Sequence, residues 1–112
     1  MACRIQSTKC HLERKGVRIA KRLLGIKHRE IYDAPFDLVN KQFGYEIKAL
    51  SVNQKDFKIH ISKSSMDNKL KLAEIKQIQP ILVAIVIDTN SFKAYQSQLR
   101  SHIRINQMER II

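Results

Sequence analysis

The sequence lacks the features that define several common protein classes. Its two cysteines, Cys3 and Cys10, are too few for a disulfide framework, and no second pair of ligands completes a zinc site. No apolar stretch approaches the roughly 18 residues that a membrane-spanning helix needs. Residues 1–10 lack the apolar core of a signal peptide. No repeat, low-complexity segment or linker divides the chain. We therefore expect one cytoplasmic domain with free thiols, in the host cytoplasm if the protein is phage-encoded.

Acidic residues are scarce relative to basic ones. The 112 residues include 10 Asp and Glu against 21 Lys and Arg, which gives a formal net charge of +11 and a pI of about 10.0. Such an excess favours binding to nucleic acid, although an inert basic surface is the alternative. Five cations fall within nine residues with no acidic residue among them, and we predict that they contact phosphates: Arg14, Lys15, Arg18, Lys21 and Arg22.

Helical periodicity marks the first predicted element. From Leu12 to Leu24, apolar residues recur at intervals of three and four, and Gly25 follows where a helix would end. The preceding residues, 1–11, show no clear period and are predicted to form a flexible arm. Residues 12–112 are then the single domain, which is long enough to bury its own core.

The remaining pattern alternates between strands and one more helix. Strands are predicted at 45–50, 56–62, 81–87, 92–95 and 102–105. The strand at 81–87 is apolar on both faces, which is typical of a central, often parallel strand, whereas the one at 92–95 is predicted at an edge. A second helix ends before Pro80 and supplies the crossover that a parallel strand needs. The apolar face of that helix is predicted to comprise Met66, Leu70, Ala73 and, a turn further on, Ile78. These elements predict an α/β fold with a mixed central sheet flanked by helices.

One group of polar residues could carry chemistry. Glu46 and Lys48 are two residues apart in a predicted strand, so their side chains point to the same face. A tight hairpin through residues 41–44 would bring Asp37 back beside them. Two carboxylates can hold Mg²⁺ or Mn²⁺, and the lysine could orient a water molecule or stabilise charge on a phosphate. The alternative is an ordinary exposed strand beside a turn aspartate.

These residues resemble the PD-(D/E)XK nuclease superfamily, which has the restriction-endonuclease-like fold. The superfamily motif is Pro-Asp, a variable gap, then Asp or Glu, any residue, and Lys. Here Pro35, Asp37, Glu46 and Lys48 match it, with one extra residue between the first two. The resemblance extends over roughly residues 12–87, because the order of helices and strands also agrees. Small basic members include Holliday-junction resolvases and nucleases of phages or mobile elements.

The resemblance implies a role for each matching position. It implies two carboxylate metal ligands, a main-chain carbonyl as a third ligand and a catalytic lysine: Asp37, Glu46, Ile47 and Lys48. Many members also use an acidic residue on the first helix, for which Glu13 is the candidate. In many members a polar or basic residue on the second helix approaches the site, and Lys69 and Lys76 are both candidates.

The sequence as a whole thus predicts an endodeoxyribonuclease that depends on Mg²⁺, with Mn²⁺ as a substitute. Its partner would be DNA, with RNA not excluded, and a homodimer is a candidate assembly. No membrane partner is expected. The alternative is a non-catalytic nucleic-acid-binding or assembly module of the same fold, which would keep the basic surface without needing the site.

Overall fold

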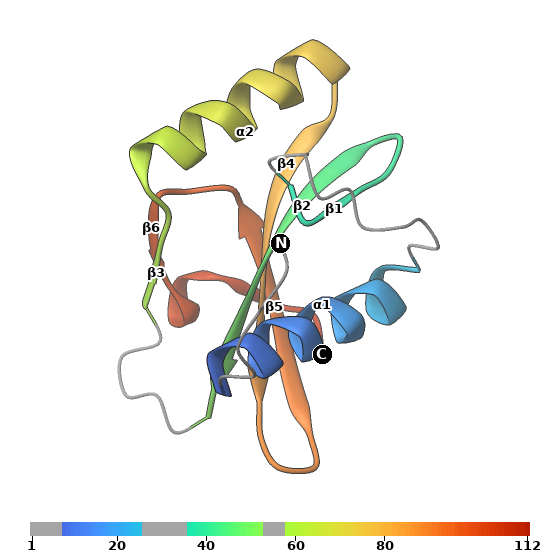
Figure 1. Ribbon diagram of the computed structural model, residues 1–112, viewed down its shortest axis with the longest axis vertical. Coiled ribbons are helices and arrows are strands. Elements are labelled where there is room, and N and C mark those ends of the chain that lie inside the picture. Colours follow the sequence, from blue (N-terminus) through green and yellow to red (C-terminus); the bar gives the residue numbers. More distant parts are fainter. Residues whose placement is uncertain (1–7, 26–35, 53–57) are drawn as a thin grey trace.

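The computed structural model describes residues 8–25, 36–52 and 58–112 (Figure 1). This part of the chain is an α/β fold in which two α-helices, α1 (Thr8–Leu24) and α2 (Lys63–Lys76), pack against a mixed five-stranded sheet. The strands are β1 (Leu38–Val39), β2 (Phe43–Ser51), β3 (Lys58–His60), β4 (Gln79–Ile87), β5 (Phe92–Gln98), β6 (His102–Arg104) and β7 (Glu109–Arg110), with a 3₁₀ helix, η1 (Ile105–Gln107), after β6.

The central sheet has the order β1-β2-β4-β5-β7. Strands β2 and β4 run parallel along their whole length, and α2 lies in the connection between them, as the sequence predicts. The other neighbours pair antiparallel. The prediction of an edge strand at 92–95 is wrong, because β7 pairs with β5 at Tyr95 and Gln96. The pairing of β5 with β7 depends on the fold of the chain, and the local periodicity of either segment does not predict it.

The strand predicted at 56–62 is not part of the central sheet. β3 pairs only with β6, in a separate two-stranded ribbon. Ile59 is buried while Lys58 and His60 are exposed, which is the alternation of a strand with one face open to solvent. The residues at 53–57, which include the start of the predicted strand, lie outside the described part of the chain.

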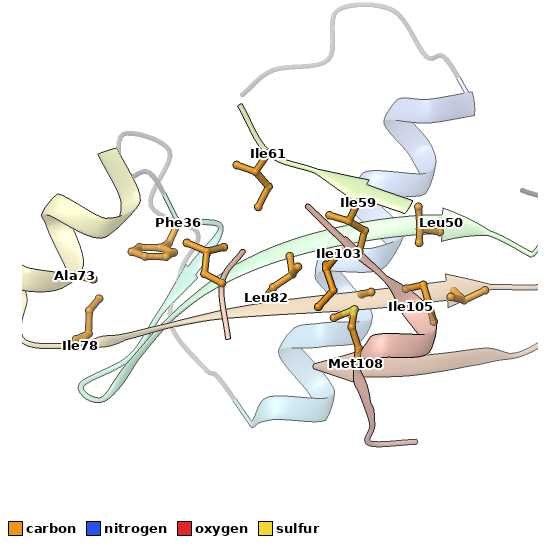
Figure 2. Packing of buried hydrophobic residues seen from close by; sticks show 13 residues of the cluster. Phe36, Leu50, Ile59, Ile61, Ala73, Ile78, Leu82, Ile103, Ile105 and Met108 are labelled. Atoms are coloured by element: carbon orange, nitrogen blue, oxygen red, sulfur yellow. The ribbon is translucent and has the colours of Figure 1, made fainter. Parts of the chain in front are cut away.

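Two hydrophobic clusters lie on opposite faces of the sheet. On one face, α1 packs against alternate residues of the central strands, including Tyr45, Ile47, Val83 and Ile85. On the other, α2, the β3–β6 ribbon and η1 cover the intervening residues, and Figure 2 shows this second cluster: Phe36, Leu50, Ile59, Ile61, Ala73, Ile78, Leu82, Ile103, Ile105 and Met108. Because side chains alternate along a strand, Glu46 and Lys48 point to this second face.

Helix α1 begins earlier than the sequence pattern predicts. It starts at Thr8 rather than Leu12, so the predicted arm is wrong for residues 8–11, while residues 1–7 lie outside the described part. Gly25 follows the helix with a φ of 66°, the left-handed conformation expected of a helix-ending glycine. Neither described helix is long and apolar enough to cross a membrane.

Helix α2 matches its predicted apolar face only in part, because Met66 and Ala73 pack in the core as predicted but the helix ends at Lys76, before Ile78. The Ser62 side chain accepts a hydrogen bond from the Ser65 N–H and caps its first turn. Leu70, predicted to be part of the apolar face, is 45% exposed, and the side chain turned inward beside it is Lys69. Burial of a lysine requires a partner charge, and that partner lies in the candidate site.

Candidate functional site

A short hairpin brings Asp37 back onto strand β2. The side-chain oxygen of Asn40 accepts hydrogen bonds at 2.8 and 2.7 Å from two main-chain N–H groups in the turn. The Asp37 N–H then donates to the Tyr45 carbonyl at 3.0 Å. In addition, the Asp37 Oδ2 accepts from the Ile47 N–H at 2.8 Å. Asp37 is therefore held against β2 through both its main-chain N–H and its side-chain carboxylate.

The residue before this carboxylate packs against the same hairpin. Phe36 is fully buried, and its ring lies so close to Gly44 that a Cβ there would meet ring carbons at 2.7–2.9 Å. Such distances are shorter than side-chain atoms tolerate, so the hairpin needs a glycine at this position. Phe36 and Gly44 together fix the direction from which Asp37 approaches the strand.

Glu46 lies between two lysines. Its Oε2 is 3.3 Å from the Lys48 Nζ, and its Oε1 is 3.5 Å from the Lys69 Nζ. Lys69 also donates a 2.6 Å hydrogen bond to the Ser65 hydroxyl, one turn earlier on α2. The two lysines differ in exposure, since the Lys48 side chain is 38% exposed and that of Lys69 only 6%. One cation therefore faces solvent and the other is part of the protein interior.

Glu46 is close enough to Asp37 to influence the ionisation of the Asp37 carboxyl group. The pKa of Asp37 is raised from 3.8 to about 6, chiefly because burial disfavours the charged form and next because the charge of Glu46 repels it. The Ile47 N–H and the Lys48 ammonium group act in the opposite direction. Near neutral pH, the Asp37 carboxyl group thus retains a proton more readily than a free aspartate does.

The structure brings together some of the predicted site residues and separates others. Asp37, Glu46 and Lys48 lie together, and of the two candidate lysines on α2 it is Lys69 that reaches them. Lys76 is exposed in the last turn of the helix. Their functional roles remain predictions.

Helix α1 lies across the sheet from these side chains. Glu13 is exposed on α1 and does not join the carboxylate pair, since no third His, Cys, Asp or Glu of the described residues completes a cluster there. The five cations predicted to contact phosphates are on the same helix and share this position: Arg14, Lys15, Arg18, Lys21 and Arg22. They therefore lie on the face of the sheet opposite to Asp37 and Glu46, and their contact with phosphates stays a prediction.

Ser65 belongs to the site although the sequence did not predict it. It lies in the first turn of α2, and its hydroxyl is the hydrogen-bond acceptor that helps to hold Lys69. A signal was present in the sequence, because a serine and a lysine four residues apart lie on the same face of a helix. That spacing is too common to have singled the pair out.

The donor set suits a divalent cation of the magnesium type. Mg²⁺ is commonly held by one or two carboxylates, with waters and substrate phosphates completing its shell, and Asp37 and Glu46 supply two. The Ile47 N–H points toward Asp37, and a strand residue directs its N–H and C=O to the same edge, so the Ile47 carbonyl lies on this edge too. A cation here would also relieve the repulsion that raises the Asp37 pKa.

Comparison with known proteins adds no name to this geometry. No family model matches the sequence, and neither the curated proteins nor the solved structures include a significant match.

Proposed function

We propose that the protein is a metal-dependent nuclease that hydrolyses phosphodiester bonds in DNA. The observation that carries the proposal is the pair of adjacent carboxylates, Asp37 and Glu46, with a pKa of about 6 for Asp37 and a half-exposed lysine beside them. A carboxyl group whose pKa is raised by burial and by a neighbouring carboxylate, as in Asp37, is typical of functional sites. The net charge of +11 suits a polyanionic substrate.

We further propose that the fold is restriction-endonuclease-like. The supporting features are the β1–β2 hairpin, the parallel pairing of β2 with β4 through α2, and helices on both faces of a mixed sheet. The acidic residue precedes the first strand of this hairpin, and the Glu-x-Lys sequence lies in its second strand. This arrangement matches the element order on which the superfamily resemblance depends.

Each side chain would have a distinct task. Asp37 and Glu46 would hold the cation, with the Ile47 carbonyl as a third donor. When bound, the cation would polarise the scissile phosphate and acidify a water molecule. Lys48, exposed beside Glu46, would orient the attacking water or stabilise charge on the phosphate. Lys69 would hold the second oxygen of Glu46 and so position that ligand.

A non-catalytic nucleic-acid-binding or assembly module is the second candidate, and one observation favours it. Both oxygens of Glu46 already face lysines, so this carboxylate is neutralised without a metal ion. An ion-pair network of this kind could serve stability alone. The two functions therefore differ in whether Asp37 and Glu46 bind a metal ion when one is offered.

A cleavage assay tests the enzymatic proposal. Plasmid, single-stranded DNA, branched DNA and RNA are incubated with Mg²⁺, Mn²⁺ or EDTA. We expect cleavage of a DNA substrate that EDTA abolishes, and a loss of about two to four powers of ten in Lys48→Met. Lys71→Met, the same change at an exposed position of α2, should cut like the wild type. Absence of cleavage of every substrate would leave the module as the better candidate.

Metal binding can be measured without turnover. Titration with Mn²⁺, followed by calorimetry, should show a site in the wild type that Asp37→Asn loses. Asp67→Asn removes an exposed carboxylate of α2 and should leave the site intact. Equal Mn²⁺ binding by wild type and Asp37→Asn would contradict the assignment of Asp37 as a ligand.

A further inference from the structure

The outward side of the β3–β6 ribbon is a basic surface that the proposed mechanism does not use. Four side chains alternate with the buried Ile59 and Ile103 and are exposed, and we refer to them as the ribbon face: Lys58, His60, His102 and Arg104. The strands pair so that Lys58 is directly opposite Arg104 and His60 directly opposite His102. The two imidazole rings are in contact, with centroids 4.3 Å apart.

This pairing places like charges across from each other. Like charges directly opposite on neighbouring strands destabilise a sheet, and no acidic residue of the described chain forms a salt bridge with Lys58 or Arg104. An anion lying along the ribbon would relieve that repulsion. A metal ion on the histidine pair would instead add positive charge between two cations, so the ribbon face favours an anionic ligand.

The ribbon face lies on the same side of the sheet as the carboxylates. Its inward residues, Ile59 and Ile103, pack in one cluster with Leu50 (Figure 2). Leu50 follows Lys48 by two residues, so the two side chains are on the same face of β2. The basic residues of α1 are on the opposite side of the sheet. A DNA strand lying across the site could therefore extend over the ribbon on the same side of the sheet, whereas α1 lies on the other side.

We propose that the ribbon face binds the phosphate backbone of the DNA whose scissile phosphate occupies the site. The inference rests on the proposed function, because it takes DNA as the partner. Lys58 and Arg104 would contact phosphate oxygens, and the imidazole N–H groups would add hydrogen bonds. Contacts of this kind fix the position of the duplex without selecting its sequence.

Salt dependence of binding provides the test. Affinity for a short fluorescent duplex is measured by anisotropy in EDTA, at several salt concentrations, for the wild type and for Lys58→Gln/Arg104→Gln. Each lost phosphate contact lowers the slope of log affinity against log salt by about 0.9, so the double variant should lose up to about 1.8. Arg14→Gln/Arg18→Gln, which removes the same charge from exposed positions of α1, is the matched control and should lose less.

A second variant distinguishes a loss of phosphate contacts from a loss of the folded ribbon. Lys58→Glu places an acidic residue opposite Arg104, which replaces a repulsive pair with an attractive one, so the ribbon should be retained. It should still weaken binding more than Lys58→Gln does. If the wild type binds DNA and the ribbon variants keep its slope, or if the α1 variant loses more, the ribbon assignment is overturned while the nuclease proposal stands. If the wild type does not bind the duplex at any salt concentration, the ribbon proposal fails, and the cleavage assay with the four substrates decides the nuclease proposal separately.

Discussion

At the scale of single residues, Asp37 links the site to stability. Its pKa is about 6 in the folded protein against 3.8 for a free side chain, so the folded state holds the proton more tightly. A raised carboxyl pKa favours folding at pH values below 3.8, and that contribution is lost as the pH rises through about 6. The free energy of unfolding at pH 8 should therefore be about 3 kcal/mol lower than it would be with the Asp37 carboxyl group protonated.

Asp37→Asn tests that expectation. The amide cannot ionise, and its oxygen can still accept from the Ile47 N–H. Urea unfolding in EDTA should find this variant more stable than the wild type near pH 8, with the difference disappearing near pH 4. Asp67→Asn, at an exposed position, should show no such trend. A stability difference that is constant with pH would mean that the Asp37 pKa is not raised.

The two lysines of Glu46 should differ in their effect on stability. Lys69 is buried, so Lys69→Met leaves Glu46 with less compensation inside the protein, and we expect a loss of about 1–3 kcal/mol. Lys48→Met removes a side chain that is 38% exposed, and solvent screening limits the loss to about 1 kcal/mol or less. Adding Glu46→Gln to Lys69→Met should recover much of the loss. Equal destabilisation by the two lysine variants in urea unfolding would contradict this.

At the scale of elements, the sequence predicts what local pattern decides. β4 is apolar on both faces and is central and parallel to β2, and Gly25 ends α1, as expected. The predicted inward face of α2 was wrong at Leu70. Lys69 points inward instead, because it pairs with Glu46 of strand β2, which the local pattern of the helix does not include. The pairing of β3 with β6 was likewise not predictable, since no property of either strand alone selects its partner.

Two glycines let the hairpin and α1 be tested separately. Gly44→Ala would push a methyl group into the Phe36 ring, and Gly16→Ala would place one 2.6 Å from the Ala49 Cβ. Each should cost about 1–3 kcal/mol of stability through overpacking. Only Gly44→Ala should also weaken Mn²⁺ binding, because it disturbs the hairpin that holds Asp37, whereas Gly16 lies across the sheet. Loss of Mn²⁺ affinity in folded Gly16→Ala would show that the two faces are not independent.

At the scale of the whole molecule, composition and arrangement contribute different information. The net charge of +11 predicts a polyanionic partner. It could not show where such a partner would lie, because the longest cluster of cations in the sequence, on α1, is across the sheet from the carboxylates. The ribbon face is assembled from residues far apart in the chain, Lys58 and His60 with His102 and Arg104, so only the folded structure brings it together.

The charge excess leads to a final prediction, on thermal stability. With 21 basic and 10 acidic residues, the positive charges of the folded protein repel one another. Salt should screen that repulsion and raise the melting temperature. Duplex DNA should raise it further at low salt, by binding the folded state, and the added effect should disappear at high salt as affinity falls. Scanning fluorimetry across a salt series, with and without duplex, measures both effects. Glu46→Gln removes one negative charge from the proposed phosphate site and should enlarge the DNA-induced rise in EDTA, whereas Glu109→Gln, on the exposed strand β7, should not. If DNA shifts the melting temperature equally at low and high salt, binding is not governed by phosphate contacts.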